Sequence, residues 1–161
     1  MLLTILADTH VSCLPRARAR DLPANVWESI RESDAVIHAG DVVDAALLEA
    51  IARMVPVHAV LGNNDLGLDL PTTLELTFED VNLAVIHDAG PRKGRPARLR
   101  RLFPGAHVVV YGHSHIPDCQ VVDDLLIINP GSCTDRRREP KFSFGRLAIE
   151  GCLTRPYIVR F

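Results

Sequence analysis

The sequence predicts an α/β fold in which two β-sheets pack together and helices cover their outer faces. The first part of the chain alternates apolar runs with helical segments, which is typical of a parallel sheet. The second part consists mainly of paired strands around short polar turns, which indicates hairpins. Apolar residues make up 47% of the 161 residues, enough for one sizeable core. We therefore expect one domain over residues 1–161.

The first part begins with a buried strand. Residues 2–7 form a continuous apolar run that stops at Asp8, as expected of a strand covered on both faces. Asn25 and Asp44 stand where helix N-caps are expected. The elements expected here are strand 2–7, helix 26–32, strand 35–37, helix 45–54 and strand 57–61.

The second part contains three predicted hairpins and one helix. Polar turn residues at 79–82, 123–124 and 150–151 separate apolar runs that can pair across them. The elements expected here are strands 74–78 and 83–86, a basic helix near 97–102, strand 108–111, strands 119–122 and 125–128, and strands 144–149 and 153–159.

Charge and cysteine usage exclude several classes of protein. The 18 Lys and Arg nearly balance the 20 Asp and Glu, and a net charge of -2 argues against a surface that coats nucleic acid or a membrane. Binding of nucleic acid through a local patch stays open. The apolar run 2–7 is too short for a signal peptide core or a membrane span. The scattered Cys13, Cys119, Cys133 and Cys152 form no zinc motif and favour a reduced, cytoplasmic setting.

Seven side chains that can bind metals follow the predicted strands, each just past a strand end. Carboxylate, amide oxygen and imidazole suit divalent first-row metals such as Mn, Fe, Ni or Zn. Residues two apart in an extended chain project to the same side, so both members of a D-x-H or H-x-H pair can face one site. The seven are Asp8, His10, Asp41, Asn63, His87, His113 and His115.

Seven donors exceed the four that one tetrahedral zinc requires, and a carboxylate such as Asp41 can bridge two cations. We therefore expect two divalent metal ions. Two metals roughly 3.5–4 Å apart activate a shared water and hold the attacking and leaving oxygens of a phosphate ester.

These residues form blocks whose order resembles the signature of the calcineurin-like phosphoesterases. A sixth block, Asn129-Pro130-Gly131-Ser132, is similar to one found in the small prokaryotic phosphodiesterase branch. The fold that this resemblance implies is a four-layer αββα sandwich of two mixed β-sheets flanked by helices. The blocks are Asp8-Thr9-His10, Gly40-Asp41, Gly62-Asn63-Asn64-Asp65, His87 and Gly112-His113-Ser114-His115.

The resemblance also implies a distribution of the ligands. Asp8, His10 and His115 would hold the first metal. Asn63, His87 and His113 would hold the second, and Asp41 would bridge the two, with a bridging hydroxide as the nucleophile. Manganese is the first expectation for the metal, with nickel, iron and zinc as alternatives.

Two residues depart from the common family pattern. Many phosphatases of the superfamily have histidine where this chain has Asn64, and an amide cannot act as a general acid. Asn64 can still donate a hydrogen bond to a substrate phosphate, so Asp41 and Asn64 are the expected catalytic residues and Asn64 the expected substrate contact. Asp88 stands where the family usually has glycine. Its carboxylate could orient a ligand histidine or could be a solvated loop residue, and the two interpretations have equal weight.

The function expected is phosphodiester hydrolysis with activated leaving groups. The alternatives are a phosphomonoesterase, including a nucleotidase, and a protein-binding scaffold, since the retromer subunit resembles the same branch. The expected partner is a small phosphate ester, with nucleotides among the candidates. Related small phosphodiesterases often associate, so a homo-oligomer stays open.

Several other residues have a plain structural interpretation. His38 is interpreted as a packing residue on its strand, with support of a metal ligand as the alternative. Cys133 lacks a paired base and is interpreted as filler. Arg136, Arg137 and Arg138 are interpreted as an exposed turn, with phosphate binding as the close alternative.

Overall fold

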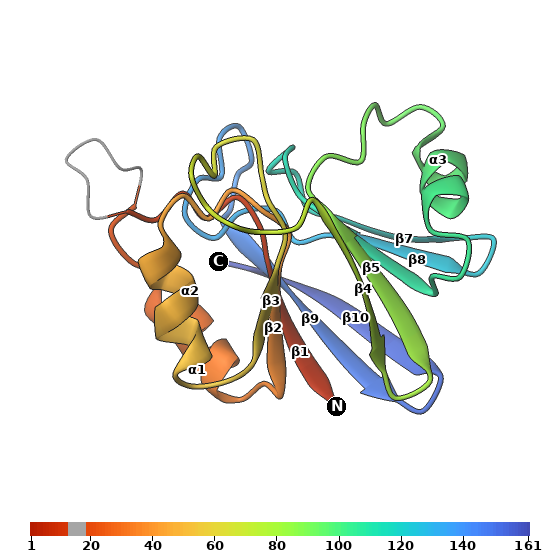
Figure 1. Cartoon of the computed structure of the whole chain (residues 1–161), viewed down its shortest axis with the longest axis horizontal. Coiled ribbons are helices and arrows are strands. Elements are labelled where there is room, and N and C mark those ends of the chain that lie inside the picture. The colour runs from red at the N-terminus through yellow and green to blue at the C-terminus, as the bar shows by residue number, and fades with distance from the viewer. Residues whose placement is uncertain (13–18) are drawn as a thin grey trace.

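The computed structural model describes residues 1–12 and 19–161, which form two five-stranded β-sheets and three α-helices (Figure 1). Helices lie on the outer side of each sheet, so the predicted arrangement of two packed sheets flanked by helices is confirmed. Cys13, one of the expected free cysteines, lies outside the described residues.

The first sheet is mixed. β1, β2 and β3 run parallel, as the strand-helix alternation predicted, and the β9–β10 hairpin pairs antiparallel with the other side of β1. The strands, in sheet order, are β10 (Leu153–Arg160), β9 (Ser143–Glu150), β1 (Leu2–Leu6), β2 (Ala35–His38) and β3 (Val57–Ala59).

The second sheet is also mixed. β5, β6 and β8 are parallel neighbours, and an antiparallel strand closes each edge. The strands, in sheet order, are β4 (Thr73–Phe78), β5 (Val81–Ile86), β6 (Val108–Tyr111), β8 (Leu125–Asn129) and β7 (Asp118–Val122).

The helices are α1 (Ala24–Arg31), α2 (Ala45–Ala52) and α3 (Arg95–Leu102). Asp44 caps α2, since its carboxylate accepts a hydrogen bond from the Ala46 backbone N–H at 3.0 Å. The prediction that Asn25 caps α1 was wrong. Pro23 occupies that position, and its carbonyl accepts the first backbone hydrogen bonds of the helix, from Val26 N and Trp27 N. Its φ of -58° suits a helix start.

The first hairpin turns more tightly than predicted. Only Glu79 and Asp80 form the turn, while Val81 and Asn82 pair with Phe78 and Thr77 in the ladder. Val81 is fully buried in the core between the sheets. Burial of this side chain therefore extends β5 by two residues towards the turn.

Three apolar clusters separate the four layers. The central cluster lies between the two sheets. A second cluster joins α1 and α2 to the outer face of the first sheet, and a third joins α3 to the outer face of the second. Burial on both faces explains why β1, β2 and β6 read as continuous apolar runs.

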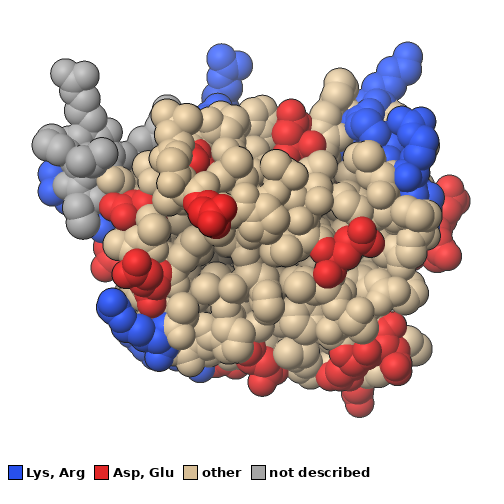
Figure 2. Space-filling view, viewed as in Figure 1, with Lys and Arg blue, Asp and Glu red and all other residues tan. Residues whose placement is uncertain are grey.

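Charged side chains of both signs are scattered over the face in view in Figure 2. The arginines of α3 are largely committed to nearby backbone. Arg95 donates to Gly90 O, Arg98 to Ala89 O, and Arg100 to Ala106 O. The basic helix therefore fastens adjacent loops to the sheet.

Candidate metal centre

The seven predicted metal ligands follow β1, β2, β3, β5 and β6, and the loops after these strands meet at one edge of the sheets (Figure 1). Backbone hydrogen bonds join the loops, from Asp8 N to Gly40 O and from His10 N to Asp41 O, both at 3.0 Å. His113 N donates to Asp8 Oδ1 at 3.1 Å. Loops from both sheets therefore form one site.

The first donor group contains Asp8, His10 and His115, all buried. The Nε2 atoms of His10 and His115 lie 3.4 Å apart, and their rings stack with centroids 5.2 Å apart. His115 Nε2 lies 3.7 Å from Asp8 Oδ1. These three side chains offer ligand atoms within 4.8 Å of one another, so one cation can contact all three.

The second donor group surrounds Asn63. Its Oδ1 lies 3.1 Å from His87 Nε2 and 2.9 Å from His113 Nδ1. The two imidazole rings meet edge to face, with centroids 5.2 Å apart. The amide oxygen and two ring nitrogens thus converge on one point.

Asp41 lies between the two groups. Its Oδ2 is 3.6 Å from His10 Nε2, and its Oδ1 is 3.6 Å from His87 Nε2. Each oxygen of this buried carboxylate therefore faces a histidine of a different group, which is the geometry expected of a bridging ligand.

Backbone carbonyls orient two of the histidines. His87 Nδ1 contacts Ala39 O at 2.7 Å, and His115 Nδ1 contacts Asp135 O at 2.5 Å. Because a carbonyl only accepts, each Nδ1 carries the proton and each Nε2 presents its lone pair to the site.

The two carboxylates have opposite pKa shifts. Burial and the nearby Asp41 raise the pKa of Asp8 to about 8. Burial alone would raise the pKa of Asp41 as well, but hydrogen bonds from Asn64 and the neighbouring His87 and His10 lower it overall. Burial also lowers the pKa of His115, which favours the neutral imidazole.

The site fits divalent cations. Asp8 Oδ2 is buried and has no hydrogen-bond partner within the part of the chain that the structure describes. A buried carboxylate is costly to ionise without a partner, and a cation at this point would supply one. The remaining donors are imidazole nitrogens and carboxylate or amide oxygens, which suit first-row divalent metals.

Five of the seven predicted ligands have a left-handed backbone, with φ between 46° and 68°. Residues other than glycine rarely adopt this backbone region, and those that do cluster at functional sites. The expectation that the D-x-H and H-x-H pairs are extended was therefore wrong. His113 contacts the second group and His115 the first. The five residues are Asp8, His10, Asp41, His113 and His115.

Asp65 has a structural role that the sequence did not reveal. Its buried carboxylate accepts hydrogen bonds from Gly62 N at 2.7 Å, Val43 N at 2.7 Å and Asp41 N at 2.9 Å. It thereby ties the loop that carries Asn63 to the loop that carries Asp41. The only sequence signal was its place in the Gly62–Asp65 block.

The segment at the end of β8 and the loop after it stabilise the site through hydrogen bonds to two ligand-bearing loops. Ser132 Oγ donates to Asp8 O at 2.8 Å, and Asn129 Nδ2 donates to Gly112 O at 2.9 Å. The Asn129–Ser132 block therefore positions the segments that carry Asp8 and His113.

His38, Asp88 and Cys133 lie near the site and have structural roles. His38 is fully buried and contacts Thr9 Oγ1 at 3.0 Å, and burial lowers its pKa to about 3, so it is neutral and supports the loop between two ligands. Asp88 is exposed and accepts from Gly90 N at 2.7 Å, which favours the loop interpretation. Burial raises the pKa of Cys133 to about 12, consistent with a packing role.

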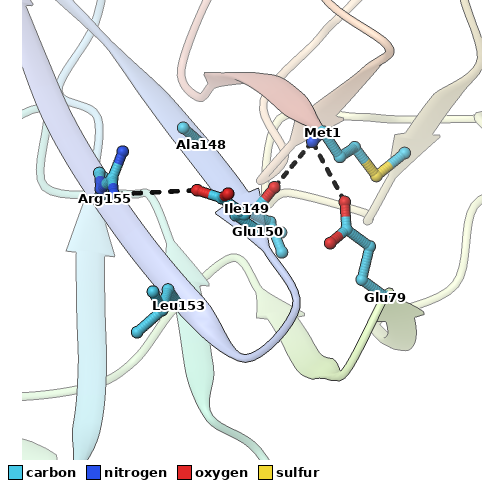
Figure 3. Close-up of a pocket in the computed structure, with 7 residues that line it drawn as sticks. All are labelled: Met1, Glu79, Ala148, Ile149, Glu150, Leu153 and Arg155. Atoms are coloured by element: carbon cyan, nitrogen blue, oxygen red, sulfur yellow. Dashed lines mark hydrogen bonds and ion pairs between the residues drawn. The ribbon is translucent and has the colours of Figure 1, made fainter.

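A separate hollow of about 290 Å³ lies at the opposite end of β1. Figure 3 shows its polar groups paired with one another: the Met1 amine with Glu79 at 3.1 Å and Arg155 with Glu150 at 3.8 Å. Because these charges already have partners and the described residues that line the hollow form no metal-binding group, the metal centre remains the candidate functional site.

A family model for the calcineurin-like phosphoesterase superfamily domain matches residues 1–151. A probable metallophosphoesterase of Methanocaldococcus jannaschii is 36% identical over 153 residues, 93% of this chain and 77% of that protein. A probable metallophosphoesterase of Bacillus subtilis is 32% identical over 124 residues, 74% of this chain and 70% of that protein.

Solved structures share the fold. Vps29 of Chaetomium thermophilum has a TM-score of 0.84 at 19% identity, covering 99% of this chain and 88% of that one. Vps29 of Entamoeba histolytica with bound zinc has a TM-score of 0.79 at 19% identity, with 99% of each chain covered. An archaeal phosphodiesterase has a TM-score of 0.70 at 23% identity, covering 99% of this chain and all of the other.

No helix among residues 1–12 and 19–161 has the length and apolar character needed to cross a membrane.

Proposed function

The chain belongs to the calcineurin-like phosphoesterase superfamily, and we propose that it is a divalent-metal-dependent phosphodiesterase. The observation that carries this proposal is the position of Asp41, whose two carboxylate oxygens each lie 3.6 Å from a histidine of a different donor group. A bridging carboxylate between two such groups is the arrangement of a two-metal phosphoryl-transfer site.

The proposed ligands divide as the donor groups do. Asp8, His10 and His115 hold one ion, Asn63, His87 and His113 hold the other, and Asp41 contacts both. When bound, such a pair lowers the pKa of a shared water and stabilises charge on the attacking and leaving oxygens. Manganese is the first candidate, and nickel, iron and zinc suit the same donors.

Asn64 determines which leaving groups the site can handle. Its side-chain amide donates one hydrogen bond to Asp41 Oδ2 at 2.6 Å, and its second N–H can donate to a phosphate oxygen. It cannot protonate a leaving alkoxide, because an amide does not titrate near neutral pH. The proposed substrate is therefore a small phosphodiester whose leaving group is stable as an anion, with nucleotides among the candidates.

The decisive experiment measures hydrolysis of an aryl phosphodiester and the matching monoester. Protein stripped of metal is refilled with manganese, nickel or zinc, alongside Asp41→Asn and the exposed-loop control Asp69→Asn. We expect metal-dependent diester turnover that Asp41→Asn abolishes and Asp69→Asn keeps. A preference for the monoester would instead identify a phosphomonoesterase.

A protein-binding scaffold is the second candidate, because Vps29 shares the fold over nearly the whole chain. Exposed apolar side chains, such as Leu66 at 88% and Val121 at 68%, are compatible with a docking surface. The complete donor set favours catalysis, since a scaffold has no need of seven converging ligands. Absence of turnover with every metal would favour the scaffold.

We place the protein in the cytoplasm, where the free Cys119, Cys133 and Cys152 would stay reduced.

A further inference from the structure

Three consecutive arginines follow the Asn129–Ser132 block, and the structure separates their roles. Arg136 donates to Glu139 O at 2.6 Å, and its guanidinium lies 5.7 Å from the centre of the Phe142 ring. Arg138 is exposed. Arg137 instead lies beside Asp135, the residue that contacts His115.

Asp135 connects Arg137 to a proposed metal ligand. Arg137 Nε lies 3.8 Å from Asp135 Oδ2, and that same oxygen lies 3.8 Å from His115 Nδ1. The Asp135 backbone carbonyl accepts the His115 Nδ1 proton at 2.5 Å. One residue therefore separates the Arg137 guanidinium from a ligand of the first donor group.

The two terminal nitrogens of Arg137 remain available to a ligand. Within residues 1–12 and 19–161 the guanidinium pairs with Asp135 alone, through Nε, and the side chain is 49% exposed. A half-exposed arginine whose terminal amino groups are not paired can bind two oxygens of one phosphate.

The positive charge of Arg137 acts on the site. It lowers the pKa of Asp8 and of His115, although burial has the larger effect on both. A cation this close to the first donor group would attract an anionic substrate to it.

The backbone of Arg137 is also unusual. Its φ of 48° lies in the left-handed region, which residues with a side chain rarely adopt. The five ligands with positive φ share this feature. Strain of this kind persists where the surrounding structure imposes it, and it concentrates at functional sites.

We propose that Arg137 is a phosphate-binding residue of the metal centre, which donates its two terminal amino groups to the phosphate of the substrate. This inference rests on the proposed phosphoesterase function and assigns a residue beyond the ligands and Asn64. In this site the cation of Arg137 stabilises charge on the phosphate, while Asn64 contributes a neutral donor.

The test is a titration of inorganic phosphate into the manganese-loaded protein by calorimetry. The variants are Arg137→Ala, Arg137→Lys and the neighbouring control Arg138→Ala. We expect Arg137→Ala to weaken phosphate binding about tenfold and Arg138→Ala less than about twofold. Arg137→Lys should recover part of the loss, because it keeps the charge and loses the fork. Manganese affinity and the melting temperature should stay unchanged in all three variants.

Three results would overturn the inference. Equal losses in Arg137→Ala and Arg138→Ala would indicate a general effect of surface charge. A loss of manganese affinity in Arg137→Ala would indicate that the residue only holds Asp135 against His115. Unchanged phosphate affinity in Arg137→Ala would show that Arg137 does not bind the phosphate. Aryl diester turnover by the wild type, measured separately, distinguishes these failures from failure of the proposed function.

Discussion

Asn64 contacts both carboxylate oxygens of Asp41. Its backbone N–H donates to Oδ1 at 2.8 Å, and its side-chain amide donates to Oδ2 at 2.6 Å. These hydrogen bonds stabilise the ionised carboxylate and lower the pKa of Asp41 against the opposing effect of burial. Asn64 therefore holds the proposed bridging ligand in its charged form.

Replacing Asn64 by histidine should restore a general acid. The wild type should cleave aryl diesters far faster than alkyl diesters, and Asn64→His should reduce this ratio by at least about tenfold, since general acid catalysis contributes that much or more. The gain on alkyl diesters should fade as pH rises through about 6.5, where histidine loses its proton. Rates for both substrates across pH provide the measurement. An unchanged ratio, or a wild type that cleaves both equally, would contradict the role given to Asn64.

Asp8 should make the metal-free protein less stable as pH rises. Its pKa is about 8 in the fold against an ordinary value of 3.8, so the folded state binds more protons between these values and stability falls towards pH 8. Burial lowers the pKa of His38 from 6.5 to about 3 and also lowers that of His115, so both act in the opposite direction, chiefly below pH 6.5. From pH 6.5 to 8 the free energy of unfolding should therefore fall by about 1 kcal/mol.

Denaturant unfolding of metal-free protein at several pH values measures this slope. Asp8→Asn should remove it, because the amide stays neutral, and should also weaken metal binding. Asp69→Asn, a change in an exposed loop, should keep the slope. A slope that survives in Asp8→Asn would assign the titration to another group.

Loss of the Asp65 carboxylate should destabilise the metal centre. Asp65→Ala leaves three backbone N–H groups without their acceptor, and each unsatisfied buried group costs about 1–3 kcal/mol. The free energy of unfolding should fall by about 3 kcal/mol or more. Manganese affinity should fall with it, because Asp41 and Asn63 lie on the two loops that Asp65 joins. Asp69→Ala in the same loop is the matched control and should change neither quantity.

Gly62 should tolerate no side chain. A Cβ at this position would overlap the backbone nitrogen and the Oδ1 of Asp41. Gly62→Ala should therefore displace Asp41 and abolish manganese binding, measured by calorimetry on folded protein. A Cβ at Gly105 has no atom of the described residues within 4 Å apart from its chain neighbours, so Gly105→Ala should bind metal as the wild type does. Normal manganese affinity in Gly62→Ala would show that the loop can move away from Asp41.

Most of the strands and helices could be predicted from the sequence, because each depends on local periodicity. Sheet membership could not be. The β9–β10 hairpin pairs with β1 rather than joining the other hairpins, since strand partners are chosen by packing between distant segments. The Asn25 cap was wrong because the helix begins at Ala24, with Pro23, two residues before Asn25, in the N-cap position.

The sequence by itself determined which residue types gather at the site, because parallel strands bring their carboxyl ends to one edge. Only the tertiary structure decided how they meet. The left-handed backbone at Asp8 and His115, the contact of Asp65 with three backbone N–H groups, and the direction of Arg137 all depend on loops far apart in the chain. Hydrogen bonds and strain between such loops leave no periodic signal in the sequence.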